Sequence, residues 1–381
     1  MEIVRVKDSG NFDFEILEST IDSLLLKCNR ETGKALTKKL GGAFKVVRVC
    51  GNSLEDLTKA IPLPENPKFN WTISSYGCDS GRYEDTKVSV SDFLRSESLG
   101  KSRFLKSDEE GDMRELRLSD LVKTVLTKDS SRVRGLDVVI DCRFGNSLYG
   151  YTEFTSDIEG FVRRDFGRPY QDPTVTLGPR LARVLVNLCG LSKGKTIFDP
   201  FCGLGTILQE AMIAGYNAVG TEISGQDVMK CRKNLDWMKK QFQISPKLSY
   251  YVTRADTFRI EKESLPKIDA IATEPILIPK LEKNPTSGEA EKIIRAAKVE
   301  YENAFRTFSR ILEKNGKVSI VVPEVVDDRG RGHSIDLGSL VDLGFSVHHP
   351  QAAGVNVENP CTVPTTKKKI IRRKVYLMTL V

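Results

Sequence analysis

Residues 196–210 read T-I-F-D-P-F-C-G-L-G-T-I-L-Q-E and decide the fold of the chain. The apolar residues before Asp199 predict a short buried strand, and the apolar spacing that begins at Thr206 predicts a helix. Between them, Gly203 and Gly205 permit unusual backbone dihedral angles and let a ligand lie against bare backbone. The first N–H groups of a helix have no partner within the helix, so we expect a polar ligand on this turn.

Two common phosphate-binding patterns are missing from the turn. It has neither the G-x-G-x-x-G of dinucleotide-binding domains nor the lysine–serine pair of a P-loop. Asp199 at the strand end can accept hydrogen bonds from an ammonium group, whereas its charge opposes a phosphate. This combination favours S-adenosylmethionine as the ligand. The alternative is a tight turn in another nucleotide-binding α/β domain.

The string resembles motif I of the Rossmann-like methyltransferases, and especially the RNA-methylase branch, in which it is written D-P-F-C-G-x-G-T. The resemblance implies a Rossmann-like α/β domain that binds S-adenosylmethionine and needs neither a metal nor a covalent intermediate. The cofactor contacts that it implies in this stretch are Asp199, Phe201, Cys202, Gly203, Gly205 and Thr206.

Two further acids follow predicted strands. Residues 218–222 read as the second strand, and its last residue, Glu222, lies 17 residues beyond Gly205. This is near the place of the ribose-binding acid in dinucleotide-binding folds, so Glu222 is predicted to bind the ribose hydroxyls. The alternative is an exposed acid that begins the next helix. Asp256 follows the third predicted strand, at 250–253, and is predicted to bind the adenine amino group.

The predicted fourth strand leads into E-P-I-L at residues 274–277. In the methyltransferases that the chain resembles, this position reads Asp or Asn, Pro, Pro, then Tyr or Phe. The resemblance implies that Glu274 accepts a hydrogen bond from an exocyclic amine and that Pro275 stiffens the loop. The ring that stacks on the flipped base is missing, and such stacking is worth about 1–3 kcal/mol per base. We expect Tyr301 or Phe305 to replace it if the site is active.

Composition limits the class of protein. At 381 residues, 40% of them apolar, the chain can bury a large core and form two or three domains. Since no apolar run reaches the roughly 20 residues of a membrane span and the N-terminus is polar, we expect a cytoplasmic protein without a membrane anchor. The formal charge of +7 leans toward a nucleic-acid partner.

The cysteines form no recognisable framework. Eight of them are spread along the chain without a C-x-x-C pair, and only three histidines occur. This pattern predicts buried free thiols, and neither disulfides nor a zinc site. Cys202 has no histidine beside it in the sequence, which disfavours a nucleophilic cysteine.

The N-terminal residues read as two smaller α/β modules. A double glycine at 41–42 and the alternating pattern after it predict a turn and a strand with one solvated face. The proline-rich stretch 62–67 is predicted to join the modules, because proline cannot continue a helix or an inner strand. The expected units are an α/β module at 1–61, a THUMP-like module at 62–155, a linker at 156–172 and a methyltransferase domain at 173–381.

The N-terminal half is similar to that of the THUMP-domain tRNA guanosine-N2 methyltransferases. The similar stretches are L-G-G-A-F-K-V-V-R-V from Leu40, W-T-I-S-S-Y-G from Trp71, and residues 151–168. The resemblance implies that these modules bind tRNA and that the methyl group goes to N2 of a guanosine, with guanosine 10 as the best match. Eukaryotic relatives in this family use a small activator subunit, which nothing in this sequence requires.

The linker places Arg163, Arg164 and Arg168 among aromatic residues. Such a mixture suits phosphate contacts combined with base stacking, which predicts an RNA-binding segment. The alternative is a linker that packs its rings on both domains and leaves the arginines in water. A basic run from Lys367 to Lys374 predicts either a basic rim or a merely solvated surface.

Two other functions stay open on these residues. Glutamate at position 274 is one methylene longer than the usual aspartate, which leaves a ribosomal-RNA guanine N2 or an adenine N6 as alternative target amines. The missing stacking ring leaves a tRNA-binding paralogue that is catalytically weak or inactive.

Overall fold

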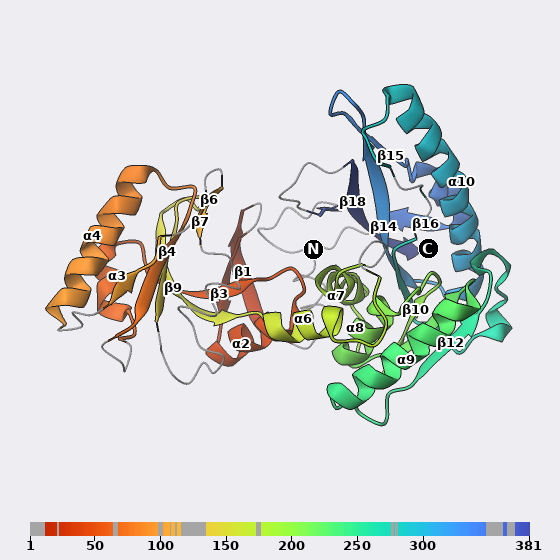
Figure 1. The fold of residues 1–381 in the computed structure, drawn as a ribbon, viewed down its shortest axis with the longest axis horizontal. Coiled ribbons are helices and arrows are strands. Elements are labelled where there is room, and N and C mark those ends of the chain that lie inside the picture. Colours follow the sequence, from red (N-terminus) through yellow and green to blue (C-terminus); the bar gives the residue numbers. More distant parts are fainter. Residues whose placement is uncertain are drawn as a thin grey trace.

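The strands form a two-stranded hairpin and two larger sheets, which make up two lobes (Figure 1). The structure is a computed structural model that describes residues 12–20, 23–63, 68–97, 102–106, 108–110, 113–115, 135–172, 177–275, 278, 281–347, 361–363 and 370–381. None of the helices in these ranges has the length and hydrophobicity that a membrane crossing requires.

A small apolar cluster holds the first elements together. These elements are β1 (Phe14–Ser19), β2 (Leu24–Cys28) and α2 (Arg30–Lys39). The two strands pair antiparallel, and buried Phe14 and Ile16 from β1 pack against Leu36 from the helix. The helix starts where the Asn29 side chain accepts a hydrogen bond from the backbone N of Thr32 (2.7 Å), which satisfies one free N–H group.

The N-terminal lobe is built on a seven-stranded sheet. Its strands are β3 (Lys45–Gly51), β4 (Asn70–Tyr76), β5 (Arg103–Phe104), β6 (Asp108–Glu110), β7 (Met113–Glu115), β8 (Leu136–Asp141) and β9 (Leu148–Thr155). Their order is β3-β9-β8-β4-β7-β6, with β5 beside β4. Helices α3 (Leu54–Ala60) and α4 (Ser80–Ser96) cover one face (Figure 1), where Leu57 and Val90 meet Ile73. Because β3 pairs with β9, this sheet spans the expected boundary at residue 61, and the division into modules stays a prediction.

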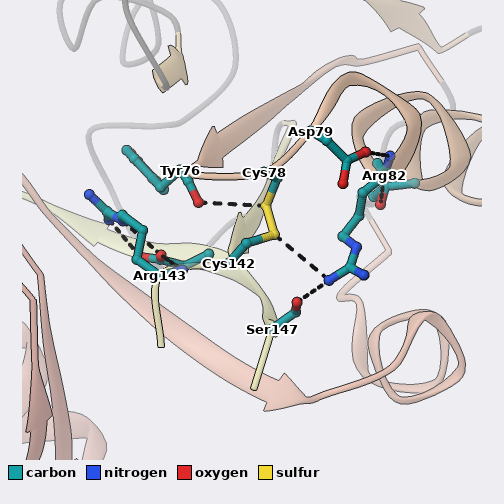
Figure 2. The surroundings of a disulfide bond; sticks show 9 residues. Tyr76, Cys78, Asp79, Arg82, Cys142, Arg143 and Ser147 are labelled. Atoms are coloured by element: carbon teal, nitrogen blue, oxygen red, sulfur yellow. Dashed lines mark hydrogen bonds and ion pairs between the residues drawn. A yellow bond between two sulfur atoms is a disulfide. The ribbon is translucent and has the colours of Figure 1, made fainter. Parts of the chain in front are cut away.

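Cys78 and Cys142 form a disulfide across this sheet (Figure 2). The expectation of free thiols is therefore wrong for this pair. β4 and β8 run parallel with Tyr76 opposite Asp141, so the residues just beyond both strands meet at one edge of the sheet. The two cysteines lie 64 residues apart in sequence, and only strand pairing brings them together. The expectation of buried thiols outside a disulfide is confirmed for Cys202 and Cys231.

We expect the double change Cys78→Ser and Cys142→Ser to destabilise the N-terminal lobe by about 4 kcal/mol, the chain-entropy value for a loop of this length. Urea unfolding followed by circular dichroism, with and without reductant, measures the effect. Cys28→Ser, at an exposed free cysteine, serves as the control and should unfold like the native protein. If reductant leaves the unfolding midpoint of the native protein unchanged, the disulfide does not contribute to stability.

The C-terminal lobe contains a nine-stranded sheet with the main order β12-β11-β10-β13-β14-β18-β16. The strands are β10 (Thr196–Asp199), β11 (Asn217–Glu222), β12 (Tyr250–Arg254), β13 (Ala270–Thr273), β14 (Lys317–Val326), β15 (Gly332–Ser334), β16 (Phe345–Val347), β17 (Cys361–Thr362) and β18 (Ile371–Leu380). The first five in this order are parallel, and β18 pairs antiparallel with both β14 and β16. The predicted Rossmann-like architecture is confirmed.

Helices cover both faces of this sheet. The helical elements are α7 (Pro179–Leu188), α8 (Thr206–Ala214), α9 (Gly225–Gln241), α10 (Ser287–Ile311) and the 3-10 turns η1 (Thr257–Arg259), η2 (Lys262–Ser264) and η3 (Gly338–Leu343). α7, α8 and α9 form one apolar core with the sheet, and α10 forms the other, around Tyr301, Phe305 and Phe308. After β12 at one side of the sheet, the chain passes β11 and β10 and forms β13 on the other side of β10. The ends of β10 and β13 therefore flank the point where the strand order reverses, which is where open α/β sheets bind ligands.

The two lobes meet at α7. Arg180 of this helix donates hydrogen bonds to the Ala43 carbonyl oxygen (2.7 Å) and to Ser156 Oγ (3.0 Å). Asn187 Nδ2 donates to the Lys39 carbonyl oxygen (2.8 Å). Gly41 is required here, because a Cβ at this position would lie 2.3 Å from the Arg180 carbonyl oxygen. The predicted double-glycine turn therefore serves as the contact between lobes.

Candidate active site

The predicted acids gather at one edge of the C-terminal sheet. Asp199 ends β10, Glu222 ends β11, and Asp256 and Glu274 directly follow β12 and β13. Since these strands are parallel and neighbouring, their carboxyl ends open on the same side. The negative charges of Glu222 and Glu274 both raise the pKa of Asp199, which shows that the three carboxyl groups are close.

Asp199 is the most buried of these acids, at 2% exposure. Its Oδ1 accepts hydrogen bonds from Thr273 Oγ1 (2.7 Å) and from the backbone N of Phe201 (3.2 Å). Burial raises the pKa of Asp199 to about 7, despite these hydrogen bonds, so the group lies near the midpoint of its titration at neutral pH. A cationic ligand group that contacts this oxygen would favour its ionised form.

The glycine turn leaves room for a ligand. Gly203 and Gly205 have φ angles of +47° and +87°, in the region that favours glycine. A Cβ at Gly205 would lie 2.6 Å from Cys231 Sγ, whereas a Cβ at Gly203 would meet nothing within 4 Å. Glu222 faces this turn: its Oε2 accepts from the backbone N of Gly203 (3.1 Å) and its Oε1 from that of Ser224 (3.0 Å). An open turn beside two carboxylates suits a ligand with amine and hydroxyl groups.

Cys202 and Thr206 turn their side chains inward. The Cys202 thiol is 5% exposed, and contact with the Cys231 thiol together with burial raises its pKa well above the usual value. The Thr206 hydroxyl accepts a hydrogen bond from Arg168 Nη1 (2.7 Å). Phe201 is partly exposed, and its ring lies 6.3 Å from that of Phe258 in an edge-to-face arrangement. Of these three predicted contacts, only Phe201 presents a side chain beside the open turn.

Asp256 lies at the start of η1. Its Oδ1 accepts a hydrogen bond from the backbone N of Phe258 (3.1 Å), and its Oδ2 lies 3.5 Å from Arg259 Nε. The carboxylate is one-third exposed, at 34%. The carboxylate of Asp256 is therefore partly accessible to a ligand.

Glu274 forms an ion pair that the sequence did not reveal. Arg373 Nε of β18 lies 2.5 Å from Glu274 Oε1, and the Glu274 side chain is 13% exposed. The neighbours of Arg373 point to the other face of the strand, where Arg372 (3.3 Å) and Lys374 (2.7 Å) both contact Glu324. Alternation along a strand predicts this split, but only the pairing of β14 with β18 shows which acids are met.

The described basic residues Arg372, Arg373 and Lys374 thus form ion pairs but stay partly exposed, and the basic rim stays a prediction. Lys367, Lys368 and Lys369 lie outside the described residues. Ile276 and Leu277, which replace the expected stacking ring, also lie outside them. Within the described ranges, no group of three or more histidine, cysteine, aspartate or glutamate side chains is arranged to hold a metal ion.

Comparison with known proteins explains this arrangement. Residues 167–275 match the model of the RMKL-like methyltransferase domain. This stretch of the chain is therefore similar to the methyltransferase domain of that family. The matched segment contains the open turn and all four acids at the strand ends.

Two archaeal relatives are named tRNA (guanine(10)-N2)-dimethyltransferase. The protein from Methanothermobacter thermautotrophicus is 27% identical over 349 residues, which cover 91% of this chain and 88% of the relative. The protein from Pyrococcus abyssi is 35% identical over 115 residues, 30% of each chain. The crystal structure of SMU.472, a putative methyltransferase complexed with SAH, has 14% identity and a TM-score of 0.50 over 99% of this chain and 94% of that one. This last likeness shows the methyltransferase fold alone.

The aromatic rings expected to replace the lost stacking ring are in the core of the methyltransferase domain. Tyr301 is fully buried, and its hydroxyl donates to the Val321 carbonyl oxygen (2.8 Å). Phe305 is also fully buried and packs edge-to-face on Phe345. Neither ring can reach a base at the strand ends, so this expectation is wrong. Both belong to the apolar face of α10, which a helical pattern would have indicated.

Two of the three linker arginines expected to bind RNA are buried. Helix α6 (Ile158–Phe166) turns Arg164 inward, where its Nε lies 2.5 Å from Glu210 of the methyltransferase domain. Arg168 is also buried, at 3% exposure. Neither side chain lies on the surface in this structure, so burial does not support their assignment to RNA binding, which stays a prediction. Arg163 remains exposed, and it contacts Gln241 and the Phe242 ring.

Proposed function

We propose that this methyltransferase transfers a methyl group from S-adenosylmethionine to N2 of a guanosine in tRNA, with guanosine 10 as the target. The observation that carries the proposal is the meeting of the open glycine turn of β10 with Glu274 of β13, in a chain that aligns over 91% of its length with a tRNA (guanine(10)-N2)-dimethyltransferase. The candidate cofactor site at the end of β10 and the acid proposed to contact the substrate at the end of β13 thus lie on the two sides of the point where the strand order reverses.

The acids at the strand ends would each bind a different group of the cofactor. Asp199 and Glu222 would accept hydrogen bonds from the ammonium and ribose hydroxyl groups of the cofactor, and Asp256 from its adenine amino group. The glycine turn lets the ligand approach the backbone closely. When bound, S-adenosylmethionine supplies the electrophilic methyl group.

Glu274 would orient the acceptor amine. The lone pair of the guanine N2 amine is shared with the ring, so the amine is a weak nucleophile. A carboxylate that accepts a hydrogen bond from N2–H fixes the amine in line with the methyl group and excludes competing water, and such positioning can supply several kcal/mol. Arg373 holds one oxygen of Glu274, which leaves the other for the amine. Pro275 is buried and limits the motion of the backbone beside it.

The N-terminal lobe would bind the tRNA outside the target nucleotide. The contacts of Arg180 and Asn187 hold the two lobes together, so RNA bound by the first lobe would be presented to the second at a set distance. We also propose that this region consists of a first module and a THUMP-like module, which bind the tRNA together. The proposal includes no activator subunit and expects the protein to act in the cytoplasm.

Methyl transfer to unmodified tRNA tests the proposal. Labelled S-adenosylmethionine is incubated with the protein and bulk unmodified tRNA, and the digested nucleosides are separated. We expect the label in N2-methylguanosine or N2,N2-dimethylguanosine. Label in N6-methyladenosine would contradict the proposed amine. Binding of tRNA and cofactor without any label would assign the chain a binding role instead, as the missing stacking ring allows.

A further inference from the structure

Among the residues that the structure describes, the buried guanidinium of Arg168 has no anionic partner. It is 3% exposed, its Nη1 donates to Thr206 Oγ1 (2.7 Å), and its Nε has no hydrogen-bond partner. Asp165 influences its pKa electrostatically but forms no ion pair with it within the described ranges. A buried charge without a counter-ion is unfavourable unless something else satisfies it.

Two other buried arginines nearby have a carboxylate of the protein as their partner. Arg164 and Arg183 are as buried as Arg168, and both contact the same carboxylate, Glu210, at 2.5 Å and 2.6 Å. That cluster is complete within the protein. Arg168 lies in the same linker and packs on the same helix, α8, yet it lacks such a carboxylate. The difference points to an anion that the described residues do not supply.

Arg168 lies at the start of α8, beside the glycine turn. Thr206, its hydrogen-bond partner, is the first residue of the helix, and no side chain caps the helix at Gly205. Asn234 ties the linker to the turn, because its Oδ1 accepts from the backbone N of Tyr170 (2.9 Å) and its Nδ2 donates to the Leu204 carbonyl oxygen (3.0 Å). The guanidinium therefore contacts the first residue of a helix whose first N–H groups also favour an anion.

We propose that Arg168 binds the carboxylate of the methionine end of S-adenosylmethionine, while Asp199 binds its ammonium group. The inference rests on the proposed function only for the identity of the cofactor. A carboxylate suits the site better than a phosphate, because Asp199, Glu222 and Glu274 would repel a doubly charged group. The zwitterionic end of the ligand would thus lie between a buried acid and a buried base. In this account Arg168 is a binding residue for the cofactor and has no contact with RNA.

A matched pair of ligands separates this role from a structural one. S-adenosylmethionine and decarboxylated S-adenosylmethionine share the sulfonium, the amine and the nucleoside, and differ only in the carboxylate. Isothermal titration calorimetry without tRNA measures both, so the result does not depend on which nucleotide is methylated. The native protein should bind S-adenosylmethionine about 10- to 100-fold more tightly, as expected for a charged hydrogen bond.

The change Arg168→Met should remove most of that preference. Binding of S-adenosylmethionine should weaken about 10- to 100-fold and binding of the decarboxylated ligand less than about threefold, and Arg168→Lys should restore part of the difference. Arg306→Met, at an exposed position of α10, is the control and should bind both ligands like the native protein.

Equal weakening of both ligands in Arg168→Met would overturn the proposal, because it would show a structural role. Equal affinity of the native protein for the two ligands would also overturn it, and that measurement needs no variant that might fold poorly. A protein that binds neither ligand would instead contradict the proposed cofactor. Binding with the expected preference but without tRNA methylation would contradict the proposed reaction and leave this inference intact.

Discussion

Replacing Glu274 with alanine should lower the rate of methyl transfer to tRNA by about 100-fold or more, the usual effect of losing a positioned group that exchanges hydrogen bonds with the reacting amine. Glu274 is the described acid that directly follows β13, and Arg373 holds it at 2.5 Å. The variant leaves the glycine turn and Asp199 intact. Cofactor binding should therefore change less than about threefold. Single-turnover transfer and calorimetry on the same samples measure the two quantities.

Glu324→Ala is the matched control for Glu274→Ala. Glu324 pairs with Arg372 and Lys374 of the same strand, so its removal also breaks contacts between β18 and a carboxylate. It lies on β14, and the two basic residues that it contacts point to the other face of β18 from Arg373. Transfer by this control should stay within about threefold of native. If the two variants lose activity equally, Glu274 supports the sheet and does not orient the amine.

Glu274→Gln gives a finer test of the same residue. The amide keeps an oxygen that can accept from N2–H but cannot form an ion pair with Arg373. We expect a rate between those of the native protein and Glu274→Ala. A glutamine variant as slow as the alanine variant would mean that the ion pair, and not the acceptor oxygen alone, sets the geometry.

Cofactor affinity should depend on pH through Asp199, whose pKa burial raises to about 7. Below this pH the carboxyl is mostly protonated and must lose its proton to bind an ammonium group. A single group with this pKa is about eight times more ionised at pH 7.5 than at pH 6, so the dissociation constant of S-adenosylhomocysteine should be about eightfold larger at pH 6. Calorimetry in buffers of different ionisation enthalpy should also detect proton release on binding.

Asp199→Asn should weaken binding at pH 7.5 by about 10- to 100-fold and flatten the pH profile, because the amide cannot ionise. A variant that keeps the native pH dependence would assign the titration to another group. The matched control is Asp236→Asn, at an exposed acid of α9 that contacts the Tyr250 hydroxyl, and it should keep both the native affinity and the native pH profile.

The same raised pKa affects folding stability with the opposite sign from a paired surface carboxylate. Between about pH 4 and pH 7, Asp199 is ionised in the unfolded chain but still protonated in the folded protein. The folded state binds more protons in this range, so the Asp199 contribution to stability falls as the pH rises through it. Bound cofactor should offset this loss.

The parts of the site that could be predicted from the sequence are local ones. The strand, turn and helix at 196–210 follow from a continuous stretch, and Glu222 and Asp256 follow from strand ends in the same manner. Parallel strands then bring these acids together without any knowledge of distant contacts.

The parts that could not be predicted depend on contacts between distant segments. Glu274 and Arg373 are 99 residues apart, and Arg164 and Glu210 are 46 apart. A basic residue beside an aromatic ring has the same local pattern whether it contacts a phosphate or a buried glutamate. Only the packing of α6 on α8 decides between them, and it buries the arginines that composition had assigned to RNA.

The disulfide could not be predicted from the sequence either, because it also depends on a contact between distant segments. Sequence spacing alone gives no reason to pair Cys78 with Cys142, since the pairing follows from the register of β4 and β8. Disulfides are rare in cytosolic proteins outside hyperthermophiles. The urea experiment in reductant therefore bears on the expected cytoplasmic location as well as on stability.

Methyl transfer to two tRNA transcripts that differ only at nucleotide 10 tests the central claim most directly. One transcript carries guanosine at this position and the other adenosine, and both are incubated with labelled S-adenosylmethionine before nucleoside analysis. The account predicts labelled N2-methylguanosine or its dimethyl form from the first transcript and no label from the second. Equal labelling of both transcripts, or label in a nucleoside other than guanosine, would contradict it.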